Sequence, residues 1–362
     1  MRDIEKFLGC IIGGAVGDAL GYAVEFMSED EIFKVYGKSG ITSYDGKGII
    51  SDDTQMTLFT AAGLLNGITV MMNTDYKAPF EEFIRMNYLN WFETQRDGKV
   101  GDGCTWLSDV EELFVQRAPG ITCLSALGTG GFGTIDNPIN QSKGCGGVMR
   151  VAPIGLYFTD QGQSYERVAS LGARVAALTH GHPLGYIPSA ALVHIIHKLS
   201  QDDVSILEAV RSSIDLMEDM FAHERYLGEF ITIMERAIEL SQSEIDDLQA
   251  IHQLGEGWVA EEALAIAVYC SLKYHNDYEQ AVITAVNHKG DSDSTGAITG
   301  NIIGTKLGYS AIPKRFLENL ELIDVMFELT KDLYMDIQFD QESLEKDELW
   351  LKRYLRDDHQ LK

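Results

Sequence analysis

The sequence predicts an all-α fold, built as one helical domain with long functional loops. Three observations support this prediction. Apolar residues recur at helical spacing in many segments. The alternation of period two that β-strands show is hard to find over more than a few residues. Only seven prolines interrupt the chain, and most fall between the helical segments. We expect helices over 53–66, 165–178, 184–199, 204–221, 227–240, 258–274, 278–287 and 315–335.

Two of the expected helices carry small residues at three- and four-residue spacing, one near the start of the chain and one near residue 300. Small side chains let helix axes approach closely. Glycine costs a helix about 1 kcal/mol relative to alanine, so its repeated use indicates a packing or site requirement. The small residues are Gly9, Gly13, Gly14, Gly17, Gly296, Ala297, Gly300 and Gly304. The longest loops are expected at 39–52 and 128–148, both rich in glycine.

The composition narrows the possible partners. The chain has 362 residues, 45% of them hydrophobic, which is enough for a large buried core. A formal net charge of −26 disfavours nucleic acid and anionic membranes as general partners. Acidic residues crowd 202–262 and 336–358. Such runs usually form a solvated face, and a docking surface for a basic protein is the alternative.

The cysteines and the apolar runs bear on the compartment. Five cysteines are scattered without CxxC spacing, which argues against a disulfide framework or structural zinc and favours a reducing cytoplasm. No run of about 18 apolar residues indicates a membrane span. The short, glycine-rich apolar stretch near the N-terminus does not have the pattern of a signal peptide. We therefore expect a cytoplasmic protein that does not bind membranes.

Two acidic clusters stand directly before apolar helical segments. They read Ser51-Asp52-Asp53-Thr54 and Asp291-Ser292-Asp293-Ser294-Thr295. Either cluster alone could be a helix N-cap, because such side chains accept hydrogen bonds from free backbone N–H groups. One cap needs only one side chain, however, and neighbouring buried carboxylates repel each other unless a cation lies between them. Oxygen ligands select Mg²⁺, Mn²⁺ or Ca²⁺, and the absence of histidine argues against zinc.

Further candidate residues lie between the two acidic clusters. Residues 142–150 (SKGCGGVMR) form a glycine-rich loop that leads into a helix. The loop is either an ordinary tight connection or a place where backbone N–H groups approach a diphosphate. Lys143 is a candidate charge partner there, and Arg150 is either a second one or a buried structural residue. His180 and His182 stand at an expected helix end before Pro183, and such a pair usually serves as a cap or as packed side chains.

Together these motifs resemble the ADP-ribosylglycohydrolase family, which includes the dinitrogenase reductase-activating glycohydrolase and the ADP-ribosylarginine hydrolases. The resemblance covers about residues 5–308, and its motifs stand in the family's order. They are Gly13-Gly14-Ala15-Val16-Gly17-Asp18-Ala19-Leu20-Gly21 with Glu25, Ser51-Asp52-Asp53-Thr54, Gly144-Cys145-Gly146-Gly147-Val148-Met149-Arg150, Thr179-His180-Gly181-His182 and Gly290-Asp291-Ser292-Asp293-Ser294-Thr295-Gly296. The resemblance implies a compact orthogonal helical bundle with a central cleft that holds two Mg²⁺ or Mn²⁺ ions.

The resemblance also implies a role for each motif. The expected metal ligands are Ser51, Asp52, Asp53, Asp291, Asp293 and Ser294. The expected catalytic residues are Glu25, Asp53 and Asp293. The expected substrate-binding residues are Gly144, Cys145, Gly146, Gly147, Val148, Met149 and His180. The candidates for stacking on adenine are Trp106, Phe132 and Tyr186. One branch of the family has an Asp-Ile-Gly-x-x-Thr motif where residues 117–123 (RAPGITC) hold no carboxylate, which places more weight on Glu25 as the acid–base group.

The function implied is removal of ADP-ribose from a modified protein, with arginine as the leading linkage and free ADP-ribose as the product. One alternative is immunity against an ADP-ribosyltransferase toxin, by hydrolysis or by direct binding. Another is hydrolysis of O-acetyl-ADP-ribose or of serine- or nucleic-acid-linked ADP-ribose. A purely structural role, as in some lens crystallins, is disfavoured because all the expected metal ligands are present. We expect residues 1–335 to form the hydrolase domain and 336–362 an acidic amphipathic helix or tail.

Overall fold

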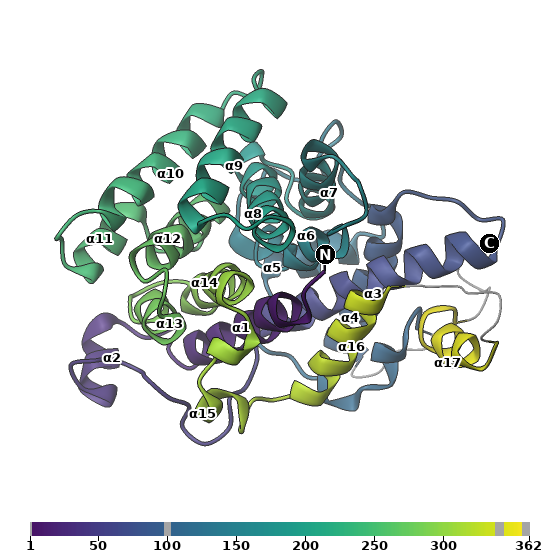
Figure 1. Cartoon of the computed structure of the whole chain (residues 1–362), viewed down its shortest axis with the longest axis horizontal. Helices are drawn as coiled ribbons and strands as arrows, with labels where there is room; N and C mark the ends of the chain where they lie inside the picture. Colours follow the sequence, from purple (N-terminus) through teal and green to yellow (C-terminus); the bar gives the residue numbers. More distant parts are fainter. Residues whose placement is uncertain (1, 98–102, 337–343, 357–362) are drawn as a thin grey trace.

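The two glycine-rich helices lie side by side at the centre of the molecule (Figure 1). A computed structural model of the chain describes residues 2–97, 103–336 and 344–356. Within these residues the fold consists of α-helices, short 3-10 turns and loops without any β-strand, which confirms the all-α prediction. The central helices are α1 (Ile4–Tyr22) and α14 (Ser292–Leu307), both buried over most of their length.

α1 and α14 run antiparallel, and glycine forms the contact between them. A Cβ atom on Gly9 would lie 2.2 Å from the carbonyl oxygen of Gly304, and one on Gly17 would lie 2.0 Å from that of Gly296. From the other side, a Cβ on Gly300 would lie 2.1 Å from the carbonyl oxygen of Gly13. These six residues form what we call the glycine seam. The predicted close packing of two small-residue helices is confirmed.

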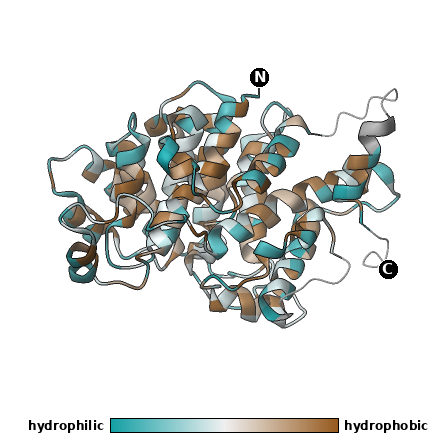
Figure 2. Ribbon diagram, turned by 90° about the horizontal axis from the view of Figure 1, so that it is seen from below, coloured by the Kyte–Doolittle hydropathy of each residue, from teal (hydrophilic) through white to brown (hydrophobic). Residues whose placement is uncertain are grey.

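The remaining helices surround this pair, and Figure 2 shows hydrophobic residues along their inward faces. They are α2 (Glu29–Tyr36), α3 (Asp52–Asn73), α4 (Phe80–Asp97), α5 (Ile121–Gly128), α6 (Ala152–Tyr157), α7 (Tyr165–Ala177), α8 (Pro183–Gln201), α9 (Ile206–Met220), α10 (Leu227–Ser241), α11 (Asp247–Leu254), α12 (Ala260–Lys273), α13 (Tyr278–Val286), α15 (Lys314–Leu317), α16 (Ile323–Met335) and α17 (Leu344–Tyr354). The 3-10 turns are η1 (Trp106–Asp109), η2 (Glu111–Leu113), η3 (Cys145–Gly147) and η4 (Tyr309–Ala311).

Most expected helices occur within a few residues of their predicted bounds. The prediction of a single helix over 315–335 is wrong. That stretch is divided into α15 and α16, and Leu322 between them adopts a left-handed conformation with φ 57°. The segment before Leu322 pairs instead with the first long loop. The N–H of Gly48 donates to the carbonyl of Asn319, and the N–H of Glu321 donates to the carbonyl of Gly48, both at 2.9 Å. This non-local pairing replaces the helical hydrogen bonds.

α3 is the one helix in the described part of the chain whose length and composition would suit a membrane span. Yet 83% of its most apolar window is buried inside the structure. It packs against α4 and also contacts α1, α6, α14, α16 and α17. Its hydropathy is that of a core helix.

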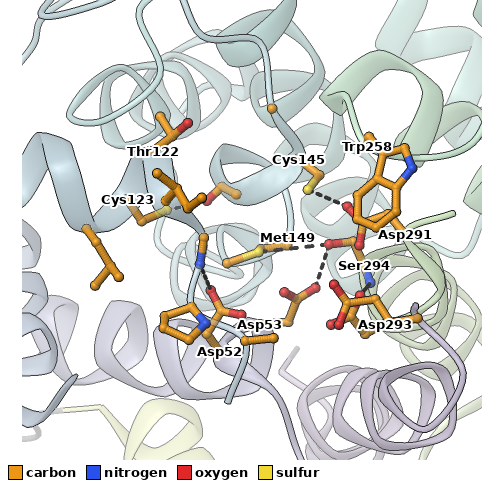
Figure 3. Close-up of a pocket in the computed structure, with 18 of the residues that line it drawn as sticks. Asp52, Asp53, Thr122, Cys123, Cys145, Met149, Trp258, Asp291, Asp293 and Ser294 are labelled. Carbon is orange, nitrogen blue, oxygen red and sulfur yellow. Dashed lines mark hydrogen bonds between the residues drawn. The ribbon is translucent and has the colours of Figure 1, made fainter. Parts of the chain in front are cut away.

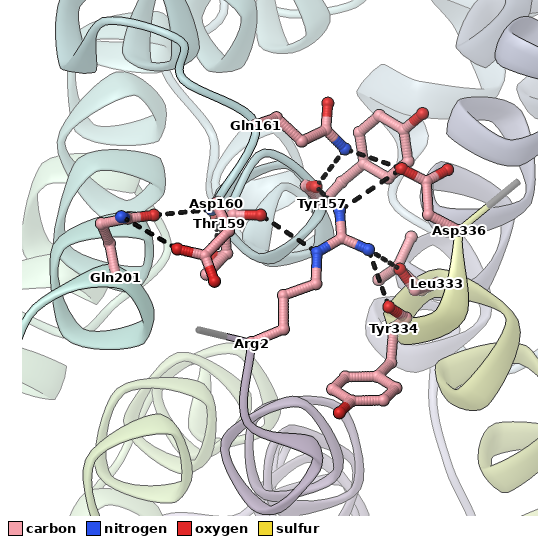
Figure 4. A network of polar contacts seen from close by, with 10 residues as sticks. Arg2, Tyr157, Thr159, Asp160, Gln161, Gln201, Leu333, Tyr334 and Asp336 are labelled. Atoms are coloured by element: carbon pink, nitrogen blue, oxygen red, sulfur yellow. Dashed lines mark hydrogen bonds and ion pairs between the residues drawn. The ribbon is translucent and has the colours of Figure 1, made fainter. Parts of the chain in front are cut away.

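The N-terminal end of α1 is fastened to α6 and α16 through Arg2 (Figure 4). The Arg2 guanidinium donates to the carbonyl oxygens of Thr159 at 3.0 Å, Tyr157 at 2.6 Å and Tyr334 at 2.7 Å. It also forms an ion pair with Asp336 at 3.4 Å. The planar fork of an arginine suits such a set of divergent acceptors. The contact fixes the end of α1 that lies far from the acidic clusters.

The helix expected near the C-terminus is present as α17, and it packs against α3. The indole N–H of Trp350 donates to the hydroxyl of Thr69 at 2.9 Å, and the Asn66 amide donates to the carbonyl of Tyr354 at 2.9 Å. Arg353 pairs with Asp332 of α16 at 2.8 Å. The division of the chain at residue 336 stays a prediction, and much of the expected acidic tail lies outside the described residues.

Candidate active site

The two acidic clusters predicted from the sequence meet at one end of the glycine seam. Asp52 and Asp53 begin α3, Asp291 is the N-cap of α14, and Asp293 lies in the first turn of α14. Together with Glu25, which follows α1, they line one cavity of about 640 Å³ (Figure 3). Segments that are far apart in the sequence therefore place five carboxylates in a single site.

Two glycines with positive φ bring the start of α14 to this cavity. Gly290 has φ 121°, and a Cβ there would lie 2.0 Å from the carbonyl oxygen of Glu256. Gly257 has φ 84° and passes directly against Asp291, with an added Cβ only 3.3 Å from the Cβ of that residue. The backbone N–H of Asp291 donates to the carbonyl of Glu256 at 2.8 Å. A side chain at either glycine would displace the carboxylates of α14.

The carboxylates are close enough to share a cation. One oxygen each of Glu25, Asp291 and Asp293 lie within 4.8 Å of one another. Asp53 accepts a hydrogen bond from the hydroxyl of Ser294 at 2.8 Å. On the same side of the cavity, the thiol of Cys145 donates to Asp291 at 2.5 Å. The predicted metal ligands Asp53, Asp291, Asp293 and Ser294 are thus brought together, and Asp52 lies on the same cavity wall.

A further buried carboxylate, Asp18, holds the start of α3 in place. It accepts hydrogen bonds from the backbone N–H of Ser51 at 3.0 Å and of Thr54 at 3.1 Å, and from the Thr54 hydroxyl. The sequence indicated Asp18 only as part of a motif. Its signal was its position, because a charged residue inside the apolar glycine-rich helix needs buried partners.

Burial and mutual repulsion raise the pKa values of these acids. Burial is the main cause at Glu25, followed by the charges of Asp293 and Asp52, and together they raise its pKa to about 9. Burial and the charge of Asp293 raise the pKa of Asp18 to about 7. For Asp53, burial first and neighbouring carboxylates second raise the pKa well above its usual range. Without a cation, the site favours carboxylic acids over carboxylates.

The residues fit a divalent metal. None of the five carboxylates is paired with a lysine or arginine among the residues that the structure describes. The Oε2 atom of Glu25 is buried without a hydrogen-bond partner in that part of the chain, although Glu25 is only 7% exposed. Hard oxygen donors of this kind suit Mg²⁺ and Mn²⁺. The two-metal cleft implied by the family resemblance stays a prediction.

The predicted phosphate loop forms a second wall of the same cavity. Gly144, Cys145, Gly146 and Met149 line it, and their role in substrate binding stays a prediction. Gly147 and Val148 do not line the cavity: Gly147 lies near Ala176 and Gly185, and Val148 is fully buried. The N–H of Cys145 donates to the carbonyl of Trp258 at 3.2 Å, which anchors the loop. The lack of side chains matters here, since an added Cβ on Gly146 would lie 2.9 Å from the sulfur of Cys123 and 3.1 Å from the ring of His180.

His180 also lines the cavity, and its contact with the substrate stays a prediction. Burial and, to a smaller extent, the charge of Arg150 lower its pKa to about 3. The hydroxyl of Thr179 lies 2.8 Å from Nδ1 of His180 and accepts a hydrogen bond from Arg150 at 2.7 Å. Arg150 is fully buried over the ring of Tyr88, so it is a structural residue that orients the histidine.

Several predicted residues lie elsewhere. The hydroxyl of Ser51 caps α3 by accepting from the N–H of Asp53 at 3.2 Å, and it does not line the cavity; its role as a ligand stays a prediction. Lys143 pairs with Glu261, and His182 caps α8. The stacking candidates do not line the cavity either. Trp106 packs against Tyr354 of α17, Phe132 against Arg85 of α4, and Tyr186 against Phe221.

Sequence reasoning missed the aromatic residues that do line the cavity, Phe26 and Trp258. Their rings stack with centroids 6.3 Å apart and an interplanar angle of 23°. Phe26 comes directly after Glu25, a residue that the sequence did single out. The exposure of the two rings was not visible, because a single aromatic residue beside the end of a helical segment forms no periodic pattern.

The segment without the expected carboxylate also lines the cavity, through Ala118, Pro119 and Gly120. Gly120 donates its N–H to Asp52 at 3.1 Å, and the N–H of Asp52 donates to the carbonyl of Arg117 at 3.0 Å. Ala118 adopts φ 51°, a strained conformation for a residue with a Cβ. This segment therefore supports Asp52 through its backbone and contributes no acid of its own.

The all-α fold and the acidic cavity are consistent with a known family of hydrolases. The chain belongs to the ADP-ribosylglycohydrolase family, whose model matches residues 1–343. Membership supports hydrolysis of ADP-ribose conjugates, and the family is known for the use of divalent metals. A solved structure described as an ADP-ribosylglycohydrolase-related protein complex has the same fold, with a TM-score of 0.61 and 22% identity, covering 92% of this chain and 98% of the other.

Individual relatives share between 21% and 31% identity with this chain. An uncharacterized protein of Archaeoglobus fulgidus is 31% identical, over 91% of this chain and 96% of its own. The ADP-ribosylhydrolase ARH3 of Mus musculus is 24% identical, over 93% of each chain. The ADP-ribosylarginine hydrolase Tri1 of Serratia proteamaculans is 21% identical, over 92% of this chain and 80% of its own. The names of ARH3 and Tri1 agree on the ADP-ribosyl group, and only that of Tri1 states its attachment, to arginine.

Proposed function

We propose that this protein releases ADP-ribose from modified arginine side chains of proteins, using two Mg²⁺ or Mn²⁺ ions. One observation carries the proposal. Five carboxylates from α3, α14 and the segment after α1 line one cavity, and none has a cationic partner among the described residues. Keeping such a cluster ionised at neutral pH needs divalent cations, because each buried carboxylate raises the pKa of its neighbours.

We assign the ligand positions to Asp52, Asp53, Asp291, Asp293 and Ser294. Ser51, whose hydroxyl also caps α3, is the sixth predicted ligand. When bound, the ions would supply Lewis-acid chemistry by holding ribose hydroxyls and lowering the pKa of a coordinated water. The backbone of the Gly144–Gly146 segment and the neutral His180 form the wall that we assign to the diphosphate and adjacent ribose.

Glu25 is the proposed proton carrier of the reaction. It lies beside Asp291 and Asp293, and one of its oxygens is free of protein partners among the described residues. A carboxyl group in this position can give a proton to the departing nitrogen and accept one from the attacking water. The carboxylates around it would favour the positive charge that develops at the anomeric carbon.

The charge of the site supports arginine as the linkage. The guanidinium of arginine is a delocalised cation that is weakly hydrated, so it can approach a negative, partly apolar cleft at small desolvation cost. A serine hydroxyl gains nothing from the same field. The name of the relative Tri1, an ADP-ribosylarginine hydrolase, agrees with this choice.

The test is a panel of arginine-, serine- and DNA-linked ADP-ribose substrates, each with Mg²⁺, with Mn²⁺ and with EDTA. We expect release of ADP-ribose from the arginine-linked substrate that requires metal and is lost in Glu25→Gln. Metal-independent release would contradict the binuclear mechanism, and preference for serine or DNA would contradict the linkage. A Glu25→Gln protein that still neutralises an ADP-ribosyltransferase would reveal toxin immunity by direct binding. The five free cysteines favour the cytoplasm as the place of this activity.

A further inference from the structure

The mouth of the acidic cavity carries an unusual concentration of exposed hydrophobic side chains. Phe26 is 74% exposed, Ile121 is 84% exposed and Trp258 is 42% exposed, and all three line the cavity. They come from three separate segments of a chain with a net charge of −26. Exposed apolar groups that gather at one place on such a surface mark a binding site rather than chance.

The two aromatic rings stack on each other on the side of the cavity that carries Glu25 and Asp291. Their centroids lie 6.3 Å apart at an interplanar angle of 23°, a distance too short for another ring to lie between them. We call this feature the aromatic wall (Phe26 and Trp258). A planar group of the substrate would therefore lie against the outer face of the wall.

The backbone fixes the wall next to the carboxylates. Phe26 directly follows Glu25, whose oxygen lies within 4.8 Å of those of Asp291 and Asp293. On the other side, Trp258 directly follows Gly257, which passes against Asp291. The carbonyl of Trp258 accepts from the N–H of Cys145 at 3.2 Å. Figure 3 accordingly shows the Trp258 ring beside Asp291, away from Thr122 and Cys123.

Neither ring stabilises the core. Phe26 and Trp258 belong neither to the buried hydrophobic cluster nor to the partly buried side chains packed against it. Trp106 shows the contrast, since it packs against that cluster and donates to Tyr354 at 3.2 Å. Leaving two aromatic rings in water loses the free energy that their burial would provide, so the wall is explained by a ligand.

We propose that the aromatic wall is the leaving-group subsite and that it selects a planar, delocalised cation over an aliphatic hydroxyl. This inference rests on the proposed function. An arginine guanidinium can stack on an aromatic face, where the ring quadrupole attracts its charge, while the acidic cavity floor attracts it from below. A serine-linked ADP-ribose would leave an alcohol, which has neither the plane nor the charge to use the wall.

The test compares arginine- and serine-linked ADP-ribose on matched peptides with metal-loaded protein. We expect Trp258→Ala and Phe26→Ala each to lower kcat/KM for the arginine-linked peptide by about 5- to 30-fold, mainly through KM. The same variants should change hydrolysis of the serine-linked peptide by less than about twofold. Trp258→Phe, which keeps an aromatic face, should recover most of the loss. Met72→Ala is the control, because Met72 is 52% exposed and does not line the cavity.

The outcomes separate this inference from the proposed function. A wild-type protein that releases no ADP-ribose from arginine overturns both. A wild-type protein that is active on arginine, with variants that lose activity equally on both peptides or on neither, overturns the aromatic wall alone. Thermal unfolding and metal content of each variant are measured alongside, and a loss of arginine selectivity with both unchanged supports the wall.

Discussion

The helices α1 and α14 contribute to two contrasting regions of the molecule, the glycine seam and the acidic cluster at its end. Along the glycine seam, α1 and α14 touch backbone to backbone, and nothing outside the protein is needed to complete the contact. At the end of the seam, the carboxylates after α1 and at the start of α14 are crowded together without cationic partners among the described residues. The rigid seam holds in place a cluster that would otherwise spread apart.

The comparison shows how stability and function are divided between the two regions. The seam is expected to stabilise the fold in every condition. The acidic cluster is expected to destabilise the metal-free protein and to be stable only with cations bound, because binding to the native state adds to stability. Changes in the two regions should therefore have opposite consequences.

The largest effect is expected from Asp293→Asn. Removing one ligand charge should lower release of ADP-ribose by about 1000-fold or more, which corresponds to roughly 4 kcal/mol of transition-state stabilisation. The same change should raise the thermal stability of the metal-free protein, because it relieves repulsion among buried acids. Asp219→Asn, at an exposed position of α9, is the control and should change neither quantity. Lower stability of metal-free Asp293→Asn would contradict the proposed division.

The next effect concerns pH. Glu25 and Asp18 have pKa values raised by burial from 4.5 to about 9 and from 3.8 to about 7. The folded acids bind protons more tightly than the unfolded ones, so their contribution is fully present at low pH and is lost as pH rises through these values. Metal-free protein should therefore lose stability between about pH 5 and 9, and Mn²⁺ should restore it.

The measurement is chemical denaturation in EDTA and in Mn²⁺ across that pH range. Proton release on Mn²⁺ binding, followed with a pH indicator at pH 7, gives an independent check. Stability that is insensitive to pH in EDTA, together with no proton release, would show that the carboxylates are already ionised in the metal-free protein.

The sequence predicts some of these features and misses others. The seam was predictable because glycine spacing on a helix defines one face, whatever lies opposite. The positions of Asp52 and Asp291 at helix N-termini were predictable from the sequence. That the two residues lie in one site followed from the family resemblance. The aromatic wall and the break at Leu322 depend on non-local contacts: Trp258 is placed by Cys145, and the break by a loop that begins far earlier in the chain. No local pattern reports such pairings.

The seam itself is tested by Gly300→Ala. The new Cβ would lie 2.1 Å from the carbonyl oxygen of Gly13, and backbone cannot move aside as a flexible side chain does. We expect a loss of about 1–3 kcal/mol or more in the free energy of unfolding, as for other overpacked cores. Gly228→Ala in α10 is the matched control, since nothing lies within 4 Å of its added Cβ. It should be neutral or stabilise the protein by up to about 1 kcal/mol.

The smallest effect is expected at the other end of α1, from Arg2→Lys. Lysine keeps the charge that pairs with Asp336, but its single ammonium cannot reach the divergent carbonyls of Tyr157, Thr159 and Tyr334 together. Losing one or two hydrogen bonds to a charged group should cost about 1–2 kcal/mol, measured by urea denaturation. Because Arg2 lies at the end of α1 opposite the acidic clusters, metal affinity and kcat/KM should stay unchanged. A change in metal affinity at constant stability would show that α1 transmits strain along the seam to the carboxylates.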